Sequence, residues 1–431
     1  MKKFISILLV FSLLSAYFVL GAFAAGGTDY TIINPYENVD WETFKTYKAN
    51  LHTHTSASDG ELTLTDTVQA YYELGYDILA ITDHGVINTG WMNDRKTYPL
   101  FSQFRKFEPM SEADYTRITT GADRDGRGMI DITGGIECNM AVISKTHVNG
   151  YFTTYGSGEF GRENDYKTAA VEIEKAGGYS VLNHVGDWVD SEKHPERAKK
   201  SYFIAYFADI FNTCPSCLGM EIINNTDRVT REDRVLWDEL LQVVLPGGRN
   251  IWAFADDDSE ALGDMGRSFE LFPLSANTEE NVKNAMINGA FFAASRYDKT
   301  VRGEEFEGNG LVPIVSGIYV DDAANTITVK TDETRDCSKI EWISDGKVIS
   351  NDFTIDLNDY ESRLGCYVRF KLYGEGGVTY SQAFELQYDG RTEKEAPGLH
   401  ITSERDKAVY QNIIIALLAL IVEKVWGLFT D

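Results

Sequence analysis

The sequence of 431 residues predicts an α/β domain followed by a small all-β domain. Hydrophobic residues make up 43% of the chain and charged residues 25%, a composition typical of globular proteins. From about residue 48 to residue 296, short apolar runs alternate with amphipathic stretches. That pattern predicts βα units with a parallel sheet or barrel. After residue 302, apolar and polar residues alternate between Asp, Asn and Gly turns, which predicts antiparallel strands.

The N-terminal residues 1–24 have the pattern of a secretory signal peptide. Lys2 and Lys3 precede an apolar run, and Ala22-Phe23-Ala24 has the small-x-small spacing of a cleavage site. We therefore expect a mature chain that begins near Ala25 and is secreted or extracytoplasmic. An uncleaved membrane anchor is the alternative.

Five apolar runs of the α/β part, bounded by turn residues, are expected to be buried strands. They are residues 76–82, 129–137, 179–184, 219–224 and 251–255. Amphipathic stretches at residues 64–75 and 231–244 lie between them and predict helices. The polar segment 88–127 is expected to be an insertion in a domain that spans residues 25–300.

The C-terminal part is expected to contain a β domain, a linker and a helix. Residues 311–390 predict a small antiparallel β-sandwich, and the charged residues 391–408 predict a linker. Residues 409–429 predict a hydrophobic helix that can span a bilayer, apart from Glu423 and Lys424. We expect a membrane anchor here, and an interfacial or partner-binding helix is the alternative.

The cysteines allow two pairings. Cys214-Pro-Ser-Cys217 can form a small disulfide or half of a zinc knuckle, and Cys337 and Cys366 can pair with each other. A second Cys-x-x-Cys is missing, which argues against structural zinc. The fifth cysteine, Cys138, is expected to remain a buried thiol.

The formal net charge of -26 restricts the partners. Such an acidic surface repels polyanions at long range, which argues against nucleic-acid binding. A small anionic substrate remains compatible with it, because bound metal ions can reverse the field inside a pocket.

Histidines and acidic residues gather where the predicted strands end. His52 and His54 are two residues apart, so they point to the same face of a strand, and Asp59 follows in a turn. The later members of the set are His84, Glu137, His147, His184 and the run Asp256, Asp257, Asp258 and Glu260. The carboxyl ends of parallel strands meet at one rim, so these side chains are expected to converge there. Their number predicts two or three divalent ions of zinc, manganese or iron.

The order and spacing of these motifs resemble the PHP (polymerase and histidinol phosphatase) superfamily over about residues 48–296. The matching segments are His52-x-His54 with Ser58-Asp59-Gly60, Ile-Thr-Asp-His-Gly around His84, Gly-Gly-Ile-Glu at Glu137, His147, and Asn-His-Val-Gly at His184. The resemblance implies a distorted (β/α)7 TIM-like barrel and a trinuclear metal cluster with Glu137 as the bridge. It also implies metal-dependent hydrolysis, mostly of phosphoesters.

The last motif departs from the family pattern. The family has Asp-x-His, whereas this chain reads Ala-Asp-Asp-Asp-Ser-Glu. The flanking residues look like the carbaryl-hydrolase-like branch, which makes Asp258 the ligand and places Glu260 where histidine is expected. A shift of one step makes Asp256 and Asp258 the pair instead. A carboxylate in place of an imidazole is a harder ligand and favours manganese or iron over zinc.

We hypothesise a phosphoesterase that cleaves a small phosphorylated substrate through a hydroxide bridging two metal ions, with Glu137 and Asp258 as catalytic residues. Asp59 and Asp83 can orient imidazoles or cap helices. Arg296 can contact an anionic group or form a surface ion pair. The alternatives are a carboxyl-ester or carbamate hydrolase on the same cluster, and a metal-binding surface module with reduced activity.

Overall fold

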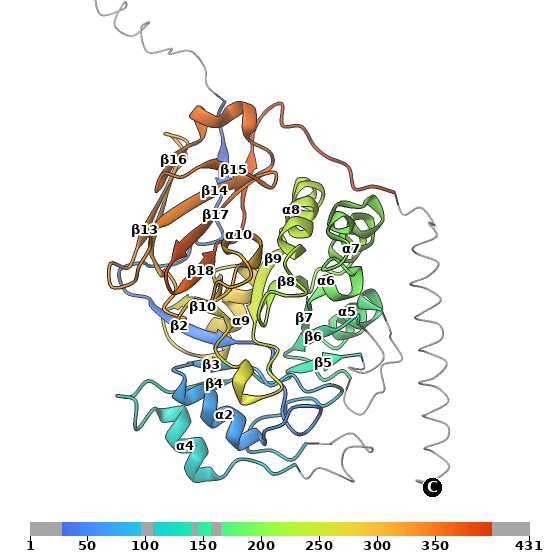
Figure 1. Cartoon of the computed structure of the whole chain (residues 1–431), viewed down its shortest axis with the longest axis vertical. Coiled ribbons are helices and arrows are strands. Elements are labelled where there is room, and N and C mark those ends of the chain that lie inside the picture. Colours follow the sequence, from blue (N-terminus) through green and yellow to red (C-terminus); the bar gives the residue numbers. More distant parts are fainter. Residues whose placement is uncertain (1–27, 96–106, 140–144, 157–164, 399–431) are drawn as a thin grey trace, which may run out of the picture.

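The structure is a computed structural model that describes residues 28–95, 107–139, 145–156 and 165–398 (Figure 1). The predicted signal peptide and the predicted C-terminal helix lie outside these residues. Within the described ranges, no helix combines the length and the apolar character needed to cross a bilayer.

A five-stranded sheet forms one wall of the α/β part. Its strands, in spatial order, are β5 (Ile136–Cys138), β6 (Val148–Tyr151), β7 (Tyr179–Leu182), β8 (Cys217–Asn224) and β9 (Trp252–Asp256). On one side of it lie the helices α5 (Tyr166–Lys175), α6 (Val185–Val189), α7 (Ser201–Thr213) and α8 (Asp233–Val244) (Figure 1). β7, β8 and β9 are parallel, but β6 runs antiparallel to β5 and β7. The start of β6 therefore lies at the edge where its neighbours end.

A second, 11-stranded sheet contains the other strands of the α/β part. β2 (Lys45–Asn50), β3 (Ile78–Leu79) and β4 (Ile130–Asp131) pair in parallel, and β10 (Ser268–Leu274) and β11 (Phe292–Ser295) continue the sheet antiparallel. Two isolated parallel bridges, Thr53–Ser259 and His84–Glu137, connect the two sheets. The fold is mixed α/β, and the closed barrel remains a prediction.

The helix α2 (Leu64–Glu73) follows the expected amphipathic pattern. The Thr63 hydroxyl accepts a hydrogen bond from the backbone N–H of Asp66, which caps the first turn. Val68 and Tyr71, three residues apart, are fully buried against the core. The helix α4 (Glu112–Thr120) lies within the predicted insertion and ends at Gly121, whose φ is +63°.

The single strand predicted at residues 129–137 is wrong. The chain forms β4, turns, and then forms β5 in the other sheet. Gly134 allows this turn because its φ is +69°, and a Cβ there would lie 2.5 Å from the backbone nitrogen of Thr153. The turn moves Glu137 from the sheet of β4 into the sheet of β5.

The C-terminal strands are antiparallel and fall into both a small sheet and the large one. β12 (Val315–Asp321), β13 (Thr326–Thr331) and β16 (Thr354–Asp356) form a three-stranded sheet. The 11-stranded sheet takes in β14 (Lys339–Ser344), β15 (Lys347–Ser350), β17 (Tyr367–Gly374), β18 (Gly377–Tyr380) and β19 (Phe384–Gln387), with β1 (Thr31–Ile33) beside β19. β18 pairs with β11, so this sheet is continuous between the two parts of the chain.

Two helices complete the regular elements that bear on the site. α9 (Glu279–Asn288) connects β10 to β11, and the short α10 (Lys299–Arg302) follows β11.

The predicted domain boundaries stay predictions. All five cysteines lie within the described ranges and none of them is in a disulfide, so neither suggested disulfide is present.

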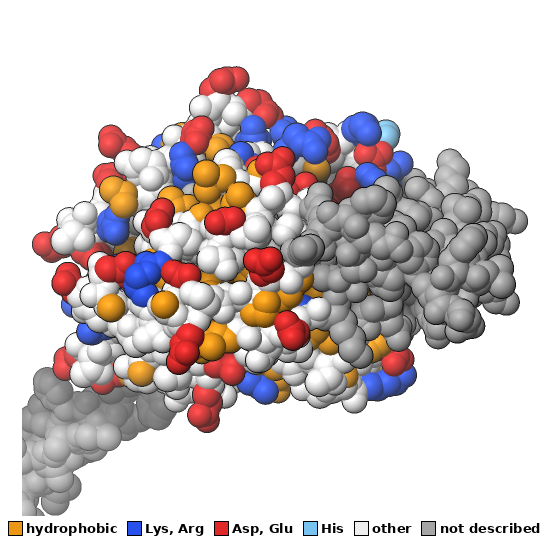
Figure 2. All heavy atoms as spheres, turned by 90° about the horizontal axis from the view of Figure 1, so that it is seen from below, with side chains coloured by type: hydrophobic (Ala, Val, Ile, Leu, Met, Phe, Trp, Pro, Cys, Tyr) orange, Lys and Arg blue, Asp and Glu red, His pale blue; other side chains and the backbone are white. Residues whose placement is uncertain are grey.

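The surface reflects the acidic composition. Figure 2 shows Asp and Glu side chains spread over one face, with Lys and Arg interspersed and hydrophobic side chains between them. This face therefore has mixed charge rather than a continuous patch of one sign.

Candidate metal centre

Seven predicted ligands come from strand ends and meet in one place. His52 and His54 follow β2, His84 follows β3, Glu137 lies in β5, His147 precedes β6, His184 follows β7 and Asp258 follows β9. His147 reaches the same edge because β6 is antiparallel. The structure thus brings together residues separated by more than 200 positions in the chain.

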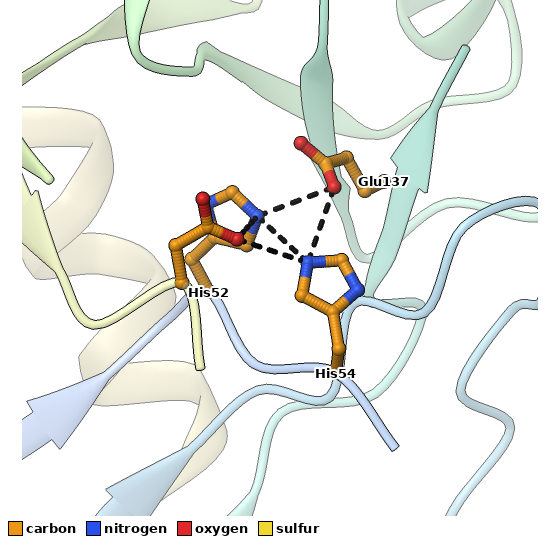
Figure 3. Close-up of side chains that lie close together, drawn as sticks. His52, His54 and Glu137 are labelled. Atoms are coloured by element: carbon orange, nitrogen blue, oxygen red, sulfur yellow. Dashed lines mark hydrogen bonds and ion pairs between the residues drawn. The ribbon is translucent and has the colours of Figure 1, made fainter. Parts of the chain in front are cut away.

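The carboxylate of Glu137 lies at the centre of this cluster and is fully buried. Its Oε2 lies 3.3 Å from Nε2 of His52 and 3.2 Å from Nε2 of both His54 and His84. Figure 3 shows His52 and His54 directed at this oxygen. A single oxygen that faces three imidazole nitrogens has the surroundings of an atom that binds cations.

The other oxygen of Glu137 faces two further imidazoles. Oε1 lies 3.2 Å from Nδ1 of His147 and 3.6 Å from Nε2 of His184. Because the two carboxylate oxygens face different histidines, Glu137 has the arrangement of a residue that bridges neighbouring cations.

Two aspartates complete the cluster. Oδ1 of Asp258 lies 3.1 Å from Nε2 of both His52 and His54. Asp59 lies across the site, with its oxygens 3.4 Å from Nδ1 of His54 and 3.4 Å from Nε2 of His84. His54 therefore has an aspartate beside each of its ring nitrogens.

Within the described residues, the ligand atoms form three groups whose members all lie within 4.8 Å of one another. These groups are His52, His54, Glu137 and Asp258; His54, Asp59 and His84; and His84, Glu137 and His147. Imidazoles and carboxylates are the ligands that zinc, manganese and iron accept.

The polar atoms of the cluster fit bound cations. Nε2 of His52 and Nε2 of His54 lie only 3.1 Å apart. The buried Oε2 of Glu137, which faces three imidazoles, has no hydrogen-bond partner among the described residues. A buried polar atom without a partner is costly, and a divalent ion would satisfy this oxygen and the imidazole nitrogens around it.

The electrostatics of the site favour positive charge. Burial lowers the pKa of the imidazoles, but Asp258 and Glu137 outweigh burial at His52 and raise its pKa well above the ordinary value of 6.5. The pKa of His184 rises to about 9, because hydrogen bonding to Glu137 likewise outweighs burial. At His84 burial prevails and lowers the pKa to about 4. The carboxylates thus create a negative potential that attracts cations.

Two buried residues hold the ligands in place. Nδ1 of His52 donates to Oε1 of Glu221 at 2.7 Å, and the backbone N–H of His184 donates to Oε2 of Glu221 at 2.7 Å. The side-chain amide of Asn183 donates to Oε1 of Glu137 at 2.7 Å. Carboxylate partners of this kind fix the tautomer and orientation of ligand imidazoles.

Asp83 binds the loop that carries Asp59. Its carboxylate accepts hydrogen bonds from the backbone N–H of Thr55 at 2.7 Å and from the hydroxyl of Ser58 at 2.8 Å. Arg95 lies 3.3 Å away and neutralises it. Asp83 therefore positions the loop rather than capping a helix.

The acidic run after β9 separates into different roles. Asp256 accepts from the backbone N–H of Leu51 at 2.7 Å, and Asp257 accepts from the backbone N–H groups of Gly266 and Ser268 at 2.7 and 2.8 Å. Asp258 is the member that reaches the histidines. It has a φ of +46°, and His184 likewise has a φ of +28°. Such left-handed backbone is costly for residues with a side chain and often occurs at functional sites.

The cluster opens into a cavity of about 510 Å³. Glu260 lines this cavity but contributes no atom to the three groups, and burial raises its pKa. Arg228 and Arg267 also line it. Arg296 does not, because its guanidinium bonds to the carbonyl of Gly308 at 2.7 Å and to Glu307 at 2.5 Å, the surface ion pair considered as its alternative role.

Sequence reasoning missed Glu221, Arg228 and Arg267. Glu221 is the only charged residue in the buried strand β8, and that isolation is a signal that could have identified it. The two arginines lie in loops without a recognisable pattern, so the sequence carries no comparable signal for them.

Residues 50–246 match the family model described as the PHP domain. No curated protein matches the chain. Among solved structures, the chain is similar to a two-domain protein from Bacteroides vulgatus that contains a predicted PHP-like metal-dependent phosphoesterase. The identity is 15%, the TM-score is 0.42, and the match covers 85% of this chain and 93% of that one.

Two further similarities are weaker. An amidohydrolase from Chromobacterium violaceum has 15% identity and a TM-score of 0.30, covering 50% of this chain and 88% of that one. A lesion-specific endonuclease from Pyrococcus furiosus has 12% identity and a TM-score of 0.32, covering 56% of each chain. At these TM-scores the structures carry no weight for function. The range matched by the PHP domain model contains six of the seven converging residues, all except Asp258.

Proposed function

We propose that this chain is a metal-dependent phosphoesterase that hydrolyses a small phosphorylated substrate in the cavity above the cluster. The observation that carries the proposal is the central carboxylate of Glu137, which faces five imidazoles with its two oxygens. The PHP domain match supports a hydrolase of this kind.

The residues that would hold metal ions are those of the three groups, with Glu137 shared between two of them. When bound, two or three divalent ions would supply Lewis-acid activation of the ester and of water. Zinc, manganese and iron all suit this donor set of imidazoles and carboxylates.

The chain's own side chains would bind and orient the substrate. The guanidinium groups of Arg228 and Arg267 line the cavity and match the geometry of a phosphate group. The cavity of about 510 Å³ has the size of a small-molecule site. Together with the net charge of -26, this favours a small anionic substrate over a nucleic acid.

The cellular setting and the overall architecture extend the proposal. We infer export through the signal peptide at residues 1–24 and membrane association through residues 409–429. We also propose that the two sheets joined at the His84–Glu137 bridge form the wall of a distorted barrel, with the cluster at its rim.

The test uses the purified full chain with Mn²⁺, Zn²⁺ or Fe²⁺. Turnover of a phosphomonoester, a phosphodiester and a carboxyl ester is measured for the wild type, for His52→Ala and for His194→Ala. His194 is an exposed histidine outside the cluster and serves as the matched control. We expect phosphoester hydrolysis that His52→Ala abolishes and His194→Ala preserves.

Metal content is measured on the same samples. Two or three ions per chain are expected for the wild type, and a count below one would contradict the proposal. Turnover of the carboxyl ester alone would establish the ester or carbamate hydrolase instead. Bound metal without turnover of any substrate would identify a metal-binding module.

A further inference from the structure

The loop at residues 225–229, called the pocket loop below, forms one side of the cavity. Asn225, Thr226, Arg228 and Val229 all line it. Asp227 lies in the middle of this loop but points inward and is fully buried. The loop's shape therefore depends on what Asp227 contacts beneath it.

Arg234, in the first turn of α8, holds Asp227 in a bidentate ion pair. Its two terminal nitrogens donate to Oδ1 and Oδ2 of Asp227 at 2.8 and 2.9 Å. The backbone N–H of Lys299 donates to the same carboxylate at 2.8 Å. Asp227 has a φ of +60°, a conformation that needs such support in a residue with a side chain.

The chain of charges continues beyond Arg234 into the C-terminal strands. Asp298, fully buried, lies 3.8 Å from the guanidinium of Arg234. It accepts hydrogen bonds from Nζ of Lys371 in β17 and from the hydroxyl of Tyr380 in β18, both at 3.1 Å. Lys371 is 5% exposed, so this contact is shielded from water.

We propose that Lys371 is a positioning residue for the pocket loop and acts through Asp298, Arg234 and Asp227. Their charges alternate, and Arg234 is held between the carboxylates of Asp227 and Asp298 in a buried environment where charges interact strongly. Without the charge of Lys371, Asp298 would attract Arg234 more strongly and draw it from Asp227. This would give the C-terminal sheet a role in substrate binding, and it rests on the proposed function.

Arg369 offers a matched control two residues away in the same strand. Its guanidinium donates to both oxygens of Asp238 in α8 at 2.7 Å and is also buried. That pair joins the same sheet to the same helix, and the hydrogen bonds of Arg369 go to Asp238 rather than to Asp298 or the pocket loop. Arg369→Met therefore reports the loss of a buried ion pair without a change at Asp298.

The experiment compares Lys371→Met, Lys371→Arg and Arg369→Met in the full chain with Mn²⁺ and a phosphomonoester. We expect Lys371→Met to raise KM about 10-fold, the effect of losing one charge-assisted contact, with a smaller change in kcat. Lys371→Arg should restore most of the affinity. An equal rise in KM in Arg369→Met would overturn the proposal.

Amide hydrogen exchange over residues 225–232 provides a readout that does not need activity. Lys371→Met is expected to speed exchange in this segment more than Arg369→Met does, and equal protection would refute the inference. A wild type without turnover would contradict the proposed function while this comparison still stands. If Lys371→Met does not fold, Tyr380→Phe removes one donor to Asp298 and should show the same exchange pattern more weakly.

Discussion

The carboxylate of Glu221 lies 2.7 Å from Nδ1 of His52, and both side chains are fully buried. Glu221 accepts the Nδ1 proton, which leaves Nε2 of His52, directed toward Glu137 and Asp258, as the ring nitrogen that would bind a cation. The pair is thus a carboxylate–histidine unit oriented toward a cation.

Replacing Glu221 by Gln should weaken metal binding. The substitution keeps the volume but removes the charge that supports His52, and such changes usually cost about 10–100-fold in metal affinity. Calorimetric titration with Mn²⁺ measures this loss. Glu341→Gln, in the C-terminal strand β14, is the control and should bind Mn²⁺ as the wild type does.

Substitutions of Asp258 and of Glu260 should have different effects on metal content. Asp258→Asn removes the negative charge of a carboxylate 3.1 Å from two imidazoles, so fewer bound ions per chain and a loss of turnover of about 100-fold or more are expected. Glu260→Gln should leave the metal content unchanged, because Glu260 lies outside the three groups. Metal analysis of both variants decides the matter, and a loss of ions in Glu260→Gln would show that Glu260 is a ligand after all.

The arginines of the cavity should determine affinity for an anionic substrate. Arg267→Ala is expected to raise KM about 10-fold or more, since charge-assisted hydrogen bonds are worth roughly 1.5–3 kcal/mol. Arg296→Ala should change KM less than about 2-fold, because Arg267 lines the cavity whereas Arg296 does not. Steady-state kinetics of the two variants would contradict this assignment if their effects were reversed.

Asp131 should make the stability depend on pH. Burial raises its pKa from 3.8 to about 7, so the folded protein keeps a proton that the unfolded chain releases. Its contribution to stability is complete below about pH 4 and is lost as the pH rises through 7. Urea unfolding of Asp131→Asn and of the wild type should give a difference that shifts in favour of the variant between pH 5 and 8.

The pKa of Asp123 is shifted in the opposite direction to that of Asp131. A hydrogen bond from Tyr72 lowers its pKa below 3.8, so its contribution is present above that pH and is lost only in stronger acid. The difference between Asp123→Asn and the wild type should therefore be constant from about pH 5 to 8. A similar slope in both variants would show that Asp131 is not the cause.

The convergence of the predicted ligands could be foreseen because local sequence patterns place them at strand ends. His84, His184 and Asp258 follow strands that are recognisable as apolar runs, and parallel strands place their ends at one edge. His147 was predicted as well, but its position depends on the antiparallel direction of β6, which the sequence pattern does not reveal.

The features that the sequence did not predict depend on contacts between segments far apart in the chain. The apolar pattern predicted β4 and β5 as one strand. It does not show the left-handed turn at Gly134, where the backbone of Thr153 approaches so closely that a Cβ has no room. Likewise, the ion pair of Arg296 with Glu307 depends on a loop that folds back after β11. The periodicity of the sequence does not reveal such tertiary contacts.

The pairing of Ala293 in β11 with Tyr380 in β18 has a consequence for engineering. A fragment that stops near residue 300 would leave β11 as an open edge, with unpaired backbone groups that invite aggregation. The hydrolytic part should therefore not be produced by truncation or exchanged as an independent cassette; swaps with relatives would have to carry the terminal strands along.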